Sequence, residues 1–361
     1  YNWNMVFFLT LLPLIGIVGT SFYIYYNGIV WQEPILLLTF WFVSGMGITM
    51  GYHRLFSHKS YEANIFIEWV LMIFGSLALE NTILKWCSDH RKHHNKSDSE
   101  EDPYSITKGF WYAHIGWVIE NTSKDRNKII SVKDLERKSA VKFQSKYYIL
   151  IALIGGFIVP FLIGLSFGRP FGALLWGSFL RITLVHHATF FINSLCHYVG
   201  KRTYDSKSSA RDSWIMSLFT FGEGYHNYHH KFPSDFRNGI SWFAFDPSKW
   251  FINILSFFGF TKNLRKTKEY LIIKSKLDSI HESISEKLLS IEKSKKDFYE
   301  ESIKKSINSA YEIINKWKKT ERFIVDKSIL KKYKSELKVI FNKLNIIYRN
   351  LNKQDLVLTS K

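Results

Sequence analysis

The sequence predicts an all-α membrane protein with four transmembrane helices, a histidine-rich cap on the cytoplasmic side and a basic, helical C-terminal tail. The 361-residue chain is 46% hydrophobic and 17% aromatic, yet its net charge is +18. This combination is typical of membrane proteins with basic cytoplasmic loops. Uncharged apolar runs reach the length of about 20 residues that crosses a bilayer. Eight of the 13 histidines fall in three short clusters.

The first two spans are expected at residues 4–26 and 29–50. Both runs are almost wholly apolar, and Asn27-Gly28 marks a turn between them. The first run is longer than the core of a signal peptide. We therefore expect it to be retained as a membrane segment.

The third and fourth spans are expected at residues 148–167 and 171–195. Residues 65–79 are also apolar but shorter, which predicts an interfacial or buried helix. Residues 95–147 are polar and charged, which predicts a soluble loop region. Since two spans precede this region and two follow it, all histidine clusters and both termini fall on one side of the membrane. The Lys- and Arg-rich loops share that side, so the positive-inside rule makes it cytoplasmic.

A membrane domain of residues 1–260 is followed by a Lys-rich tail, residues 261–361. The tail holds 25 Lys and Arg against 13 Asp and Glu. Apolar residues such as Ile273, Leu277 and Ile280 recur at three- and four-residue spacing, which predicts two or three amphipathic helices. Two uses stay open: a solvated appendage, or a docking surface for anionic lipid headgroups or an acidic electron donor.

The three histidine clusters are candidate metal ligands, because imidazole is the commonest metal ligand in proteins. In a helix, residues three and four apart share a face. Structural zinc needs only four ligands, whereas eight suit two ions of iron, zinc, copper or nickel. Neither cysteine, Cys87 or Cys196, has a CxxC partner, which argues against zinc ribbons and iron–sulfur clusters. The clustered histidines are His53, His58, His90, His93, His94, His226, His229 and His230.

The order of these clusters between apolar runs resembles the membrane fatty acid desaturases. It is most similar to the stearoyl-CoA desaturase branch, and the resemblance covers roughly residues 5–260. The stretches that carry it are Gly51–His58, Asp89–His94, Asn193–His197 and Gly222–His230.

The resemblance implies a centre of two ferrous ions, with dioxygen as co-substrate. Its ligands would be the eight clustered histidines and His197, with Asn193 acting through water, and no further catalytic residue is expected. Such an enzyme introduces a cis double bond, here expected at mid-chain in a saturated acyl chain, with acyl-CoA favoured. The family also places polar residues at the bend of an apolar substrate tunnel. The matching residues are Glu80, where the family typically has glutamine, Asn81, Trp86 and Thr189.

The group that carries the acyl chain stays open. Arg54 and Arg91 are candidate substrate contacts, with support of the ligands or contact with phospholipid as the alternatives. The basic residue that animal members carry before the second cluster is absent, so acyl-lipid or acyl carrier protein competes with acyl-CoA. His186 and His187, inside the expected fourth span, serve either hydrogen-bonded packing or the shape of the tunnel.

The sequence contains no recognisable reductase or haem module. Electrons are therefore expected from a separate protein, either a ferredoxin or a b-type cytochrome with its reductase. Membrane lipid is a further expected partner, and nucleic acid is not. Two other classes stay open: a histidine-box lipid hydroxylase or monooxygenase, and a non-enzymatic metal-binding or scaffold protein.

Overall fold

The fold is mostly helical, as the all-α prediction requires, and the chain divides into two compact units. One unit contains residues 1–200 and 210–266, and the other contains residues 201–209 and 267–361. The only sheet among the described residues pairs β1 (Glu62–Ala63) with β2 (Thr261–Lys262). The computed structural model describes residues 1–120, 128–290, 293–323 and 327–359.

Three helices in the described part are long and apolar enough to cross a membrane. They run over Trp3–Asn27, Gln32–Ser57 and Ser139–Ser166. Each contains a π-helical segment, where one turn of the backbone is widened. In order, they consist of α1 (Trp3–Pro13), η1 (Leu14–Gly19) and α2 (Thr20–Asn27); α3 (Gln32–Met46) and η2 (Gly47–Ser57); and α7 (Ser139–Leu153), η5 (Ile154–Ile158) and α8 (Val159–Ser166).

Two boundaries differ from the sequence prediction. The third span, expected to begin at residue 148, is preceded without a gap by a helical stretch that begins at Ser139, in the region predicted as a loop, where Val141 and Gln144 are buried; the two parts meet at a kink at Tyr147 (φ −117°, ψ 17°). That region also contains the short helices η3 (Ile106–Lys108), η4 (Tyr112–Gly116) and α6 (Trp117–Ile119). The second helix continues past residue 50, so His53 lies within it rather than after its end.

The predicted fourth span is helical over α9 (Pro170–Leu174), η6 (Leu175–Leu180) and α10 (Arg181–Asn193). It is not among the three long apolar helices, since Arg181, His186 and His187 interrupt its apolar run. A crossing of the membrane by this segment therefore stays a prediction.

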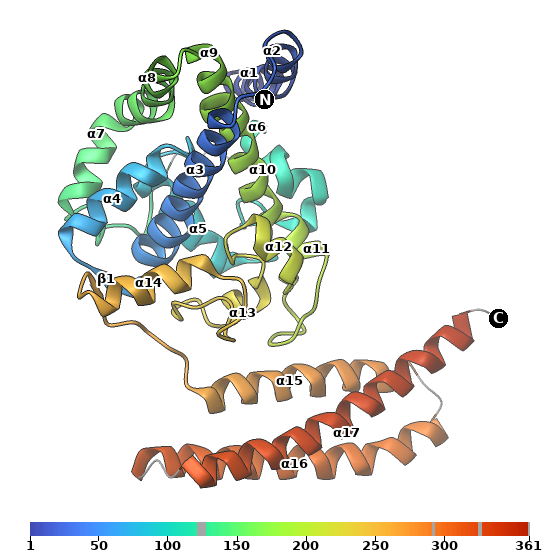
Figure 1. Cartoon of the computed structure of the whole chain (residues 1–361). Coiled ribbons are helices and arrows are strands. Elements are labelled where there is room, and N and C mark those ends of the chain that lie inside the picture. The colour runs from blue at the N-terminus through green and yellow to red at the C-terminus, as the bar shows by residue number, and fades with distance from the viewer. Residues whose placement is uncertain (121–127, 291–292, 324–326, 360–361) are drawn as a thin grey trace. The chain divides into compact units, whose positions relative to one another are not determined.

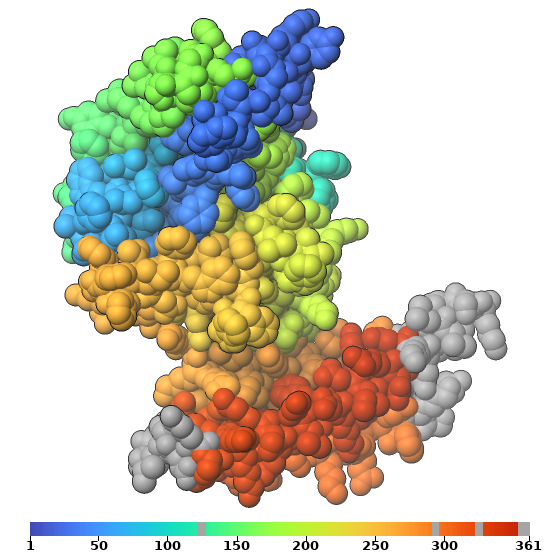
Figure 2. Space-filling view, viewed as in Figure 1, coloured from blue at the N-terminus to red at the C-terminus, as the bar shows by residue number. Residues whose placement is uncertain are grey.

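One arginine connects the turn before α9 with the turn after α2, and each of these turns joins two consecutive helices into a hairpin. Arg169 precedes α9 and donates to Glu33 at 2.9 Å. It also donates to the carbonyls of Asn27 at 3.0 Å and Gly28 at 2.9 Å, in the turn after α2. Figure 2 shows the N-terminal segment in blue against the green segment around residue 170 at one end of the unit. The two hairpin turns thus lie at the same end of the helices.

The short apolar helix expected within residues 65–79 is α4 (Ile65–Ser76), which ends inside the protein. Buried helix ends need partners for their last carbonyls. Arg181 donates to the carbonyl of Leu77, and His186 Nε2 donates to that of Ala78 at 2.9 Å. His186 thus has a hydrogen-bonded packing contact, and because it also lines the large cavity described below, its role in the shape of a tunnel stays open.

A strained turn follows α4 and leads into α5 (Ile83–Lys96). Leu79 and Asn81 have positive φ angles of 56° and 83°, which side chains other than glycine rarely adopt. The side chain of Thr82 then accepts from the Lys85 amide and begins α5. Strain of this kind persists only where the surroundings hold it in place.

The remaining helices of the first unit follow α10. They are α11 (Leu195–Tyr198), α12 (Trp214–Phe219), α13 (His226–Lys231) and α14 (Pro247–Phe257). In the second unit, three long helices pack together (Figure 1). They are α15 (Glu269–Leu288), α16 (Lys293–Phe323) and α17 (Lys327–Thr359). Their shared core includes Leu277, Ile307, Trp317 and Leu344.

Candidate metal centre and substrate cavity

The nine histidines predicted as ligands come together in two groups. Within each group, one ring nitrogen of every member lies within 4.8 Å of the others. The rings of His94 and His230, from different groups, stack with their centroids 4.4 Å apart, so the groups are neighbours. The first group contains His53, His58, His90, His94 and His229, and the second contains His93, His197, His226 and His230.

Each HxxHH cluster divides its histidines between the two groups. On α5, His90 and His94 join the first group, while His93 joins the second. On α13, His229 joins the first group, while His226 and His230 join the second. Positions i and i+4 lie one above the other on a helix, and i+3 lies beside them. One short helix can therefore serve two adjacent centres.

The histidines approach one another through Nε2. In the first group, His53 and His229 are 2.9 Å apart, and His58 and His90 are 2.8 Å apart. In the second group, His226 Nε2 lies 3.0 Å from that of both His197 and His230. A neutral imidazole has one donor and one acceptor nitrogen. When several rings present the same nitrogen to one point, they cannot all form hydrogen bonds with one another. A metal cation at that point would bind the nitrogen lone pairs instead.

The protonation of these rings also suits a metal. Burial, followed by neighbouring cationic rings, lowers the pKa of most of them well below the usual value, which favours the neutral form that binds metals. The donor set is imidazole, which suits iron among the first-row metals. The residues therefore fit two iron ions. The histidines with a lowered pKa are His58, His90, His94, His197, His226, His229 and His230.

One buried carboxylate supports one histidine in each group. Glu223 Oε2 lies 3.0 Å from His53 Nδ1 in the first group. Asp102 Oδ1 lies 2.9 Å from His93 Nδ1 in the second. A carboxylate behind the far nitrogen fixes the ring orientation and makes the metal-facing nitrogen a stronger ligand.

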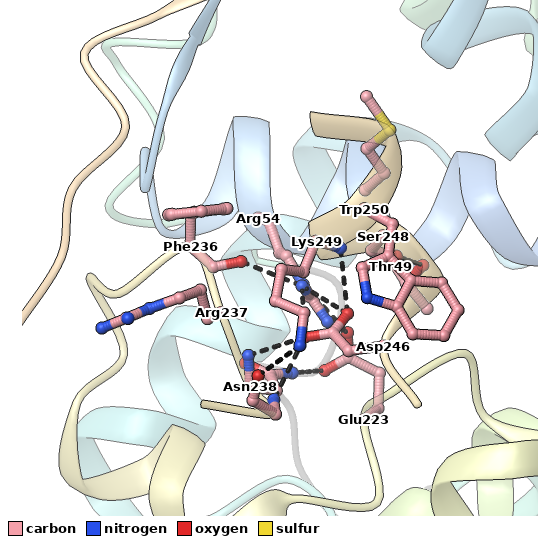
Figure 3. A network of polar contacts seen from close by, with 12 residues as sticks. Thr49, Arg54, Glu223, Phe236, Arg237, Asn238, Asp246, Ser248, Lys249 and Trp250 are labelled. Carbon is pink, nitrogen blue, oxygen red and sulfur yellow. Dashed lines mark hydrogen bonds and ion pairs between the residues drawn. The ribbon is translucent and has the colours of Figure 1, made fainter. Parts of the chain in front are cut away.

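A buried ion-pair network holds Glu223 in turn (Figure 3). Arg54 donates to Glu223 Oε1 at 3.0 Å and forms a second ion pair with Asp246 at 2.9 Å. Asn238 donates to Glu223 Oε2 at 2.7 Å. Burial alone would raise the pKa of Glu223, but His53 and Arg54 hold it below its ordinary value. The carboxylate is thereby kept ionised behind His53.

A cavity of about 310 Å³ reaches both histidine groups. Its lining includes His53 and His90 of the first group and His93 and His226 of the second. Asn193, predicted to act through water, also lines it. Away from the histidines the wall is mainly apolar, with side chains from α1, η2 and α10. These include Met5, Phe8, Leu9, Ile48, Phe190 and Ile192.

All four residues predicted at the substrate bend line this cavity. Glu80 accepts hydrogen bonds from two of the others. Thr189 donates to Glu80 Oε1 at 2.7 Å, and Trp86 Nε1 donates to Oε2 at 3.2 Å. Trp86 also stacks on His90, with ring centroids 4.9 Å apart. Asn81 is the strained residue beside them, and its amide donates to Tyr148 at 2.8 Å. Burial raises the pKa of Glu80 to about 7.

Comparison with known proteins agrees with this geometry. Residues 29–249 match the fatty acid desaturase family, and this range holds all nine histidines. The chain belongs to the fatty acid desaturase family. The resemblance drawn from the four histidine-bearing stretches is thus confirmed.

Individual desaturases show the same likeness. "Probable acyl-CoA desaturase" of Schizosaccharomyces pombe is 41% identical over 73% of this chain and 54% of its own length. "Acyl-CoA desaturase 1" of Saccharomyces cerevisiae is 35% identical over 79% and 56%. "sn-1 stearoyl-lipid 9-desaturase" of Anabaena variabilis is 34% identical over 73% and 94%. The chain thus spans about half the length of the two yeast desaturases.

Both arginines predicted as candidate substrate contacts in this desaturase family member have acidic partners, and a substrate role for them stays a prediction. Arg54 is 1% exposed, and its guanidinium is occupied by Glu223 and Asp246. Arg91 pairs with Asp134 at 2.8 Å and donates to the carbonyl of Ser57 at 3.0 Å. Neither arginine is among the residues that line the cavity. Both hold the walls of the metal centre together, because each has an acidic partner far away in the sequence.

The sequence patterns gave no role to the carboxylates that support the histidines. Glu223 stands in the quoted stretch Gly222–His230 without a role, although it precedes His226 by less than one helical turn. Asp102 lies among acidic residues that were interpreted as a soluble loop. Only Glu223 had a detectable signal, since an acid next to a histidine cluster is a common supporting residue in metal sites.

Proposed function

We propose that this protein is an oxygen-dependent fatty acyl desaturase that introduces a cis double bond at mid-chain into a saturated acyl chain. The observation that carries the proposal is a mainly apolar cavity that ends at two groups of converging imidazoles. Membership of the fatty acid desaturase family and the names of its relatives support it.

The nine histidines would hold two iron ions, and Asn193, at the cavity wall, would act through water. Bound iron would activate dioxygen, which takes two hydrogens from adjacent methylenes and, with two further electrons and protons, ends as water. Glu223 and Asp102 orient His53 and His93, so the ligands are held in place before any metal enters.

The rest of the cavity positions the acyl chain. Its apolar wall excludes water and receives the methylenes, whose burial stabilises binding by about 0.8 kcal/mol each. Trp86 and Thr189 both donate to Glu80, and the three residues would mark the bend beside His90. Correct placement of one carbon pair is the main contribution that a protein makes to such chemistry.

Acyl-CoA is the favoured substrate, with acyl-lipid as the alternative. Two relatives are named acyl-CoA desaturases and one is named a stearoyl-lipid desaturase. Lys85 is the only lysine or arginine among the described lining residues, and it pairs with Asp89. The described part of the cavity therefore gives little direct preference for a phosphate-bearing handle.

We place four spans in the membrane, with the histidines, both termini and the basic tail on the cytoplasmic side. The contact of Arg169 with the turn after α2 supports this topology, because both hairpin turns then lie on the opposite side together. A separate ferredoxin or b-type cytochrome with its reductase would supply electrons. The basic cytoplasmic face would attract an acidic donor.

The test is expression of the full chain in an unsaturated-fatty-acid auxotroph that contains an electron donor. We expect growth without supplement and a monounsaturated fatty acid whose double bond mass spectrometry can locate. The matched His229→Ala chain should yield none. A hydroxylated chain instead would support the monooxygenase class, and bound metal without any oxidised lipid would support the scaffold class.

A further inference from the structure

One loop of the histidine-bearing sequence folds with the other unit. Residues 201–209 belong to the compact unit of the C-terminal helices, although the chain before and after them belongs to the first unit. This segment follows His197 closely and precedes α13, which carries His226 and His230. The loop therefore connects three of the four histidines of the second group.

In the first unit, the two stems of this loop are bonded to each other and to α13. The Arg211 amide donates to the carbonyl of Cys196 at 2.7 Å. Asn227 on α13 donates to the carbonyl of Ala210 at 2.9 Å. The Tyr228 amide donates to Asp212 Oδ1 at 3.0 Å. The position of the stems and that of the second histidine group are thus linked.

Gly200 marks the point where the chain leaves the first unit. Its φ is 132°, in a region that favours glycine. A Cβ atom there would lie 2.5 Å from the carbonyl oxygen of Asp212 on the opposite stem. The exit of the loop is therefore defined closely, with little room to shift.

In the second unit, helix α15 holds the outer part of the loop with one row of polar side chains. Ser275 donates to the carbonyl of Tyr204 at 2.6 Å. Ser279 donates to the carbonyl of Arg202 at 3.0 Å. Both serines are buried, at 4% and 3% exposure. Further along, Glu282 Oε2 accepts from the Ser206 hydroxyl at 2.7 Å.

The spacing of this row fits one face of a helix, since positions i, i+4 and i+7 align. Leu277, Ile284 and Leu288 of the same helix belong to the core shared with α16 and α17. The serine row is therefore backed by a packed bundle. A solvated basic appendage would not require buried serines aimed at the backbone of one loop.

We propose that the C-terminal helical unit acts as a clamp on residues 201–209 and thereby positions the second histidine group. Ser275 and Ser279 fix the loop backbone, and the stems transmit this restraint to His197 and α13. Only one of the five ligands of the first group, His229, lies on α13, whereas three of the four ligands of the second group lie on α11 or α13. The clamp should therefore affect one metal site more than the other. This inference rests on the proposed two-metal centre.

The test uses the full-length protein with Ser275→Ala and Ser279→Ala combined. Loss of two hydrogen bonds changes a local equilibrium by about 5- to 30-fold. We expect hydrogen exchange in residues 201–209 and in α13 to rise by that factor. Chelator-driven iron release should become biphasic, with one of two iron equivalents released faster. The control is Ser283→Ala, since the Ser283 hydroxyl donates to the Ser279 carbonyl of its own helix at 2.9 Å.

Three results would overturn the clamp: unchanged exchange in residues 201–209, faster exchange there without any change in α13, or equal acceleration of both iron equivalents. The last result would indicate general destabilisation. A wild-type protein that binds no iron would instead contradict the proposed function. In that case, exchange in α13 would still decide whether the clamp acts.

Discussion

The two histidine groups have the same kind of ligand but different support. In the first, His53 lies in η2, His58 directly follows η2, His90 and His94 lie on α5, and His229 completes the set. Its supporting acid, Glu223, is held by the buried Arg54. In the second group, the four histidines come from α5, α11 and α13. Its supporting acid, Asp102, is buried as well, but three of the group's four histidines lie on α11 and α13, which the chain connects through residues 201–209.

Both supporting acids are buried, so the groups differ in the ion pair that Arg54 adds behind Glu223 and in the chain connectivity of their histidines. Buried ion pairs make removal of one partner costly, because the other is left unpaired. A loop-supported site loses its geometry when the loop gains freedom. The following predictions address this contrast, from the largest effect to the smallest.

The largest effect is expected from removal of adjacent ligands that serve different groups. His229→Ala should empty the first site and His230→Ala the second, and each should reduce desaturation by more than about 100-fold. The reason is that even residues that only support a ligand cost about 10- to 100-fold. Product formation and iron per chain measure this, with His281→Ala on α15 as the control. Near-normal product from either variant would contradict the assignment of that histidine as a ligand.

Substitution of the two supporting acids should separate the two kinds of support. Glu223→Gln leaves buried Arg54 with one charged partner fewer, so we expect a stability loss of about 3–5 kcal/mol. Iron affinity should also fall by about 10- to 100-fold. Asp102→Asn should lower iron affinity comparably with a smaller loss of stability. Thermal unfolding and iron titration measure both, and equal destabilisation by the two variants would remove the contrast.

A smaller, pH-dependent effect is expected at Glu80, which contacts the first group through Trp86. Its folded pKa of about 7 lies above the ordinary value of 4.5. The contribution of Glu80 to stability is therefore fully present below about pH 4.5 and is lost as pH rises through 7. The Glu80→Gln side chain cannot ionise and therefore does not lose this stability. The melting temperature of the variant should rise relative to wild type between about pH 5 and 8. A pH-independent difference would contradict the raised pKa, and Thr189→Val provides a control that keeps the carboxylate.

Much of the chain was predictable because the relevant signals are local. Uncharged apolar runs predicted the three long apolar helices, and the histidine spacing predicted which residues would meet. The fourth span stays a prediction, since Arg181 and two histidines reduce its apolar character. The hydrogen-bond partners of Arg181 and His186 include residues on other helices, which the local pattern does not show. The start of α7 was missed because the burial of Val141 and Gln144 depends on neighbours that the sequence pattern does not reveal.

The sequence by itself determined the helical class and the three histidine clusters, and its resemblance to the desaturases supplied His197 and the polar residues of the cavity wall. Helix periodicity and ligand spacing act over a few residues, so a linear pattern contains them. The tertiary structure alone decided how each cluster divides between two sites, because that depends on pairs such as His53 and His229, which are 176 positions apart. It also gave Arg54 its acidic partner Asp246, 192 positions away, and assigned residues 201–209 to the C-terminal unit. Long-range packing selects these partners, and no local pattern in the chain records the selection.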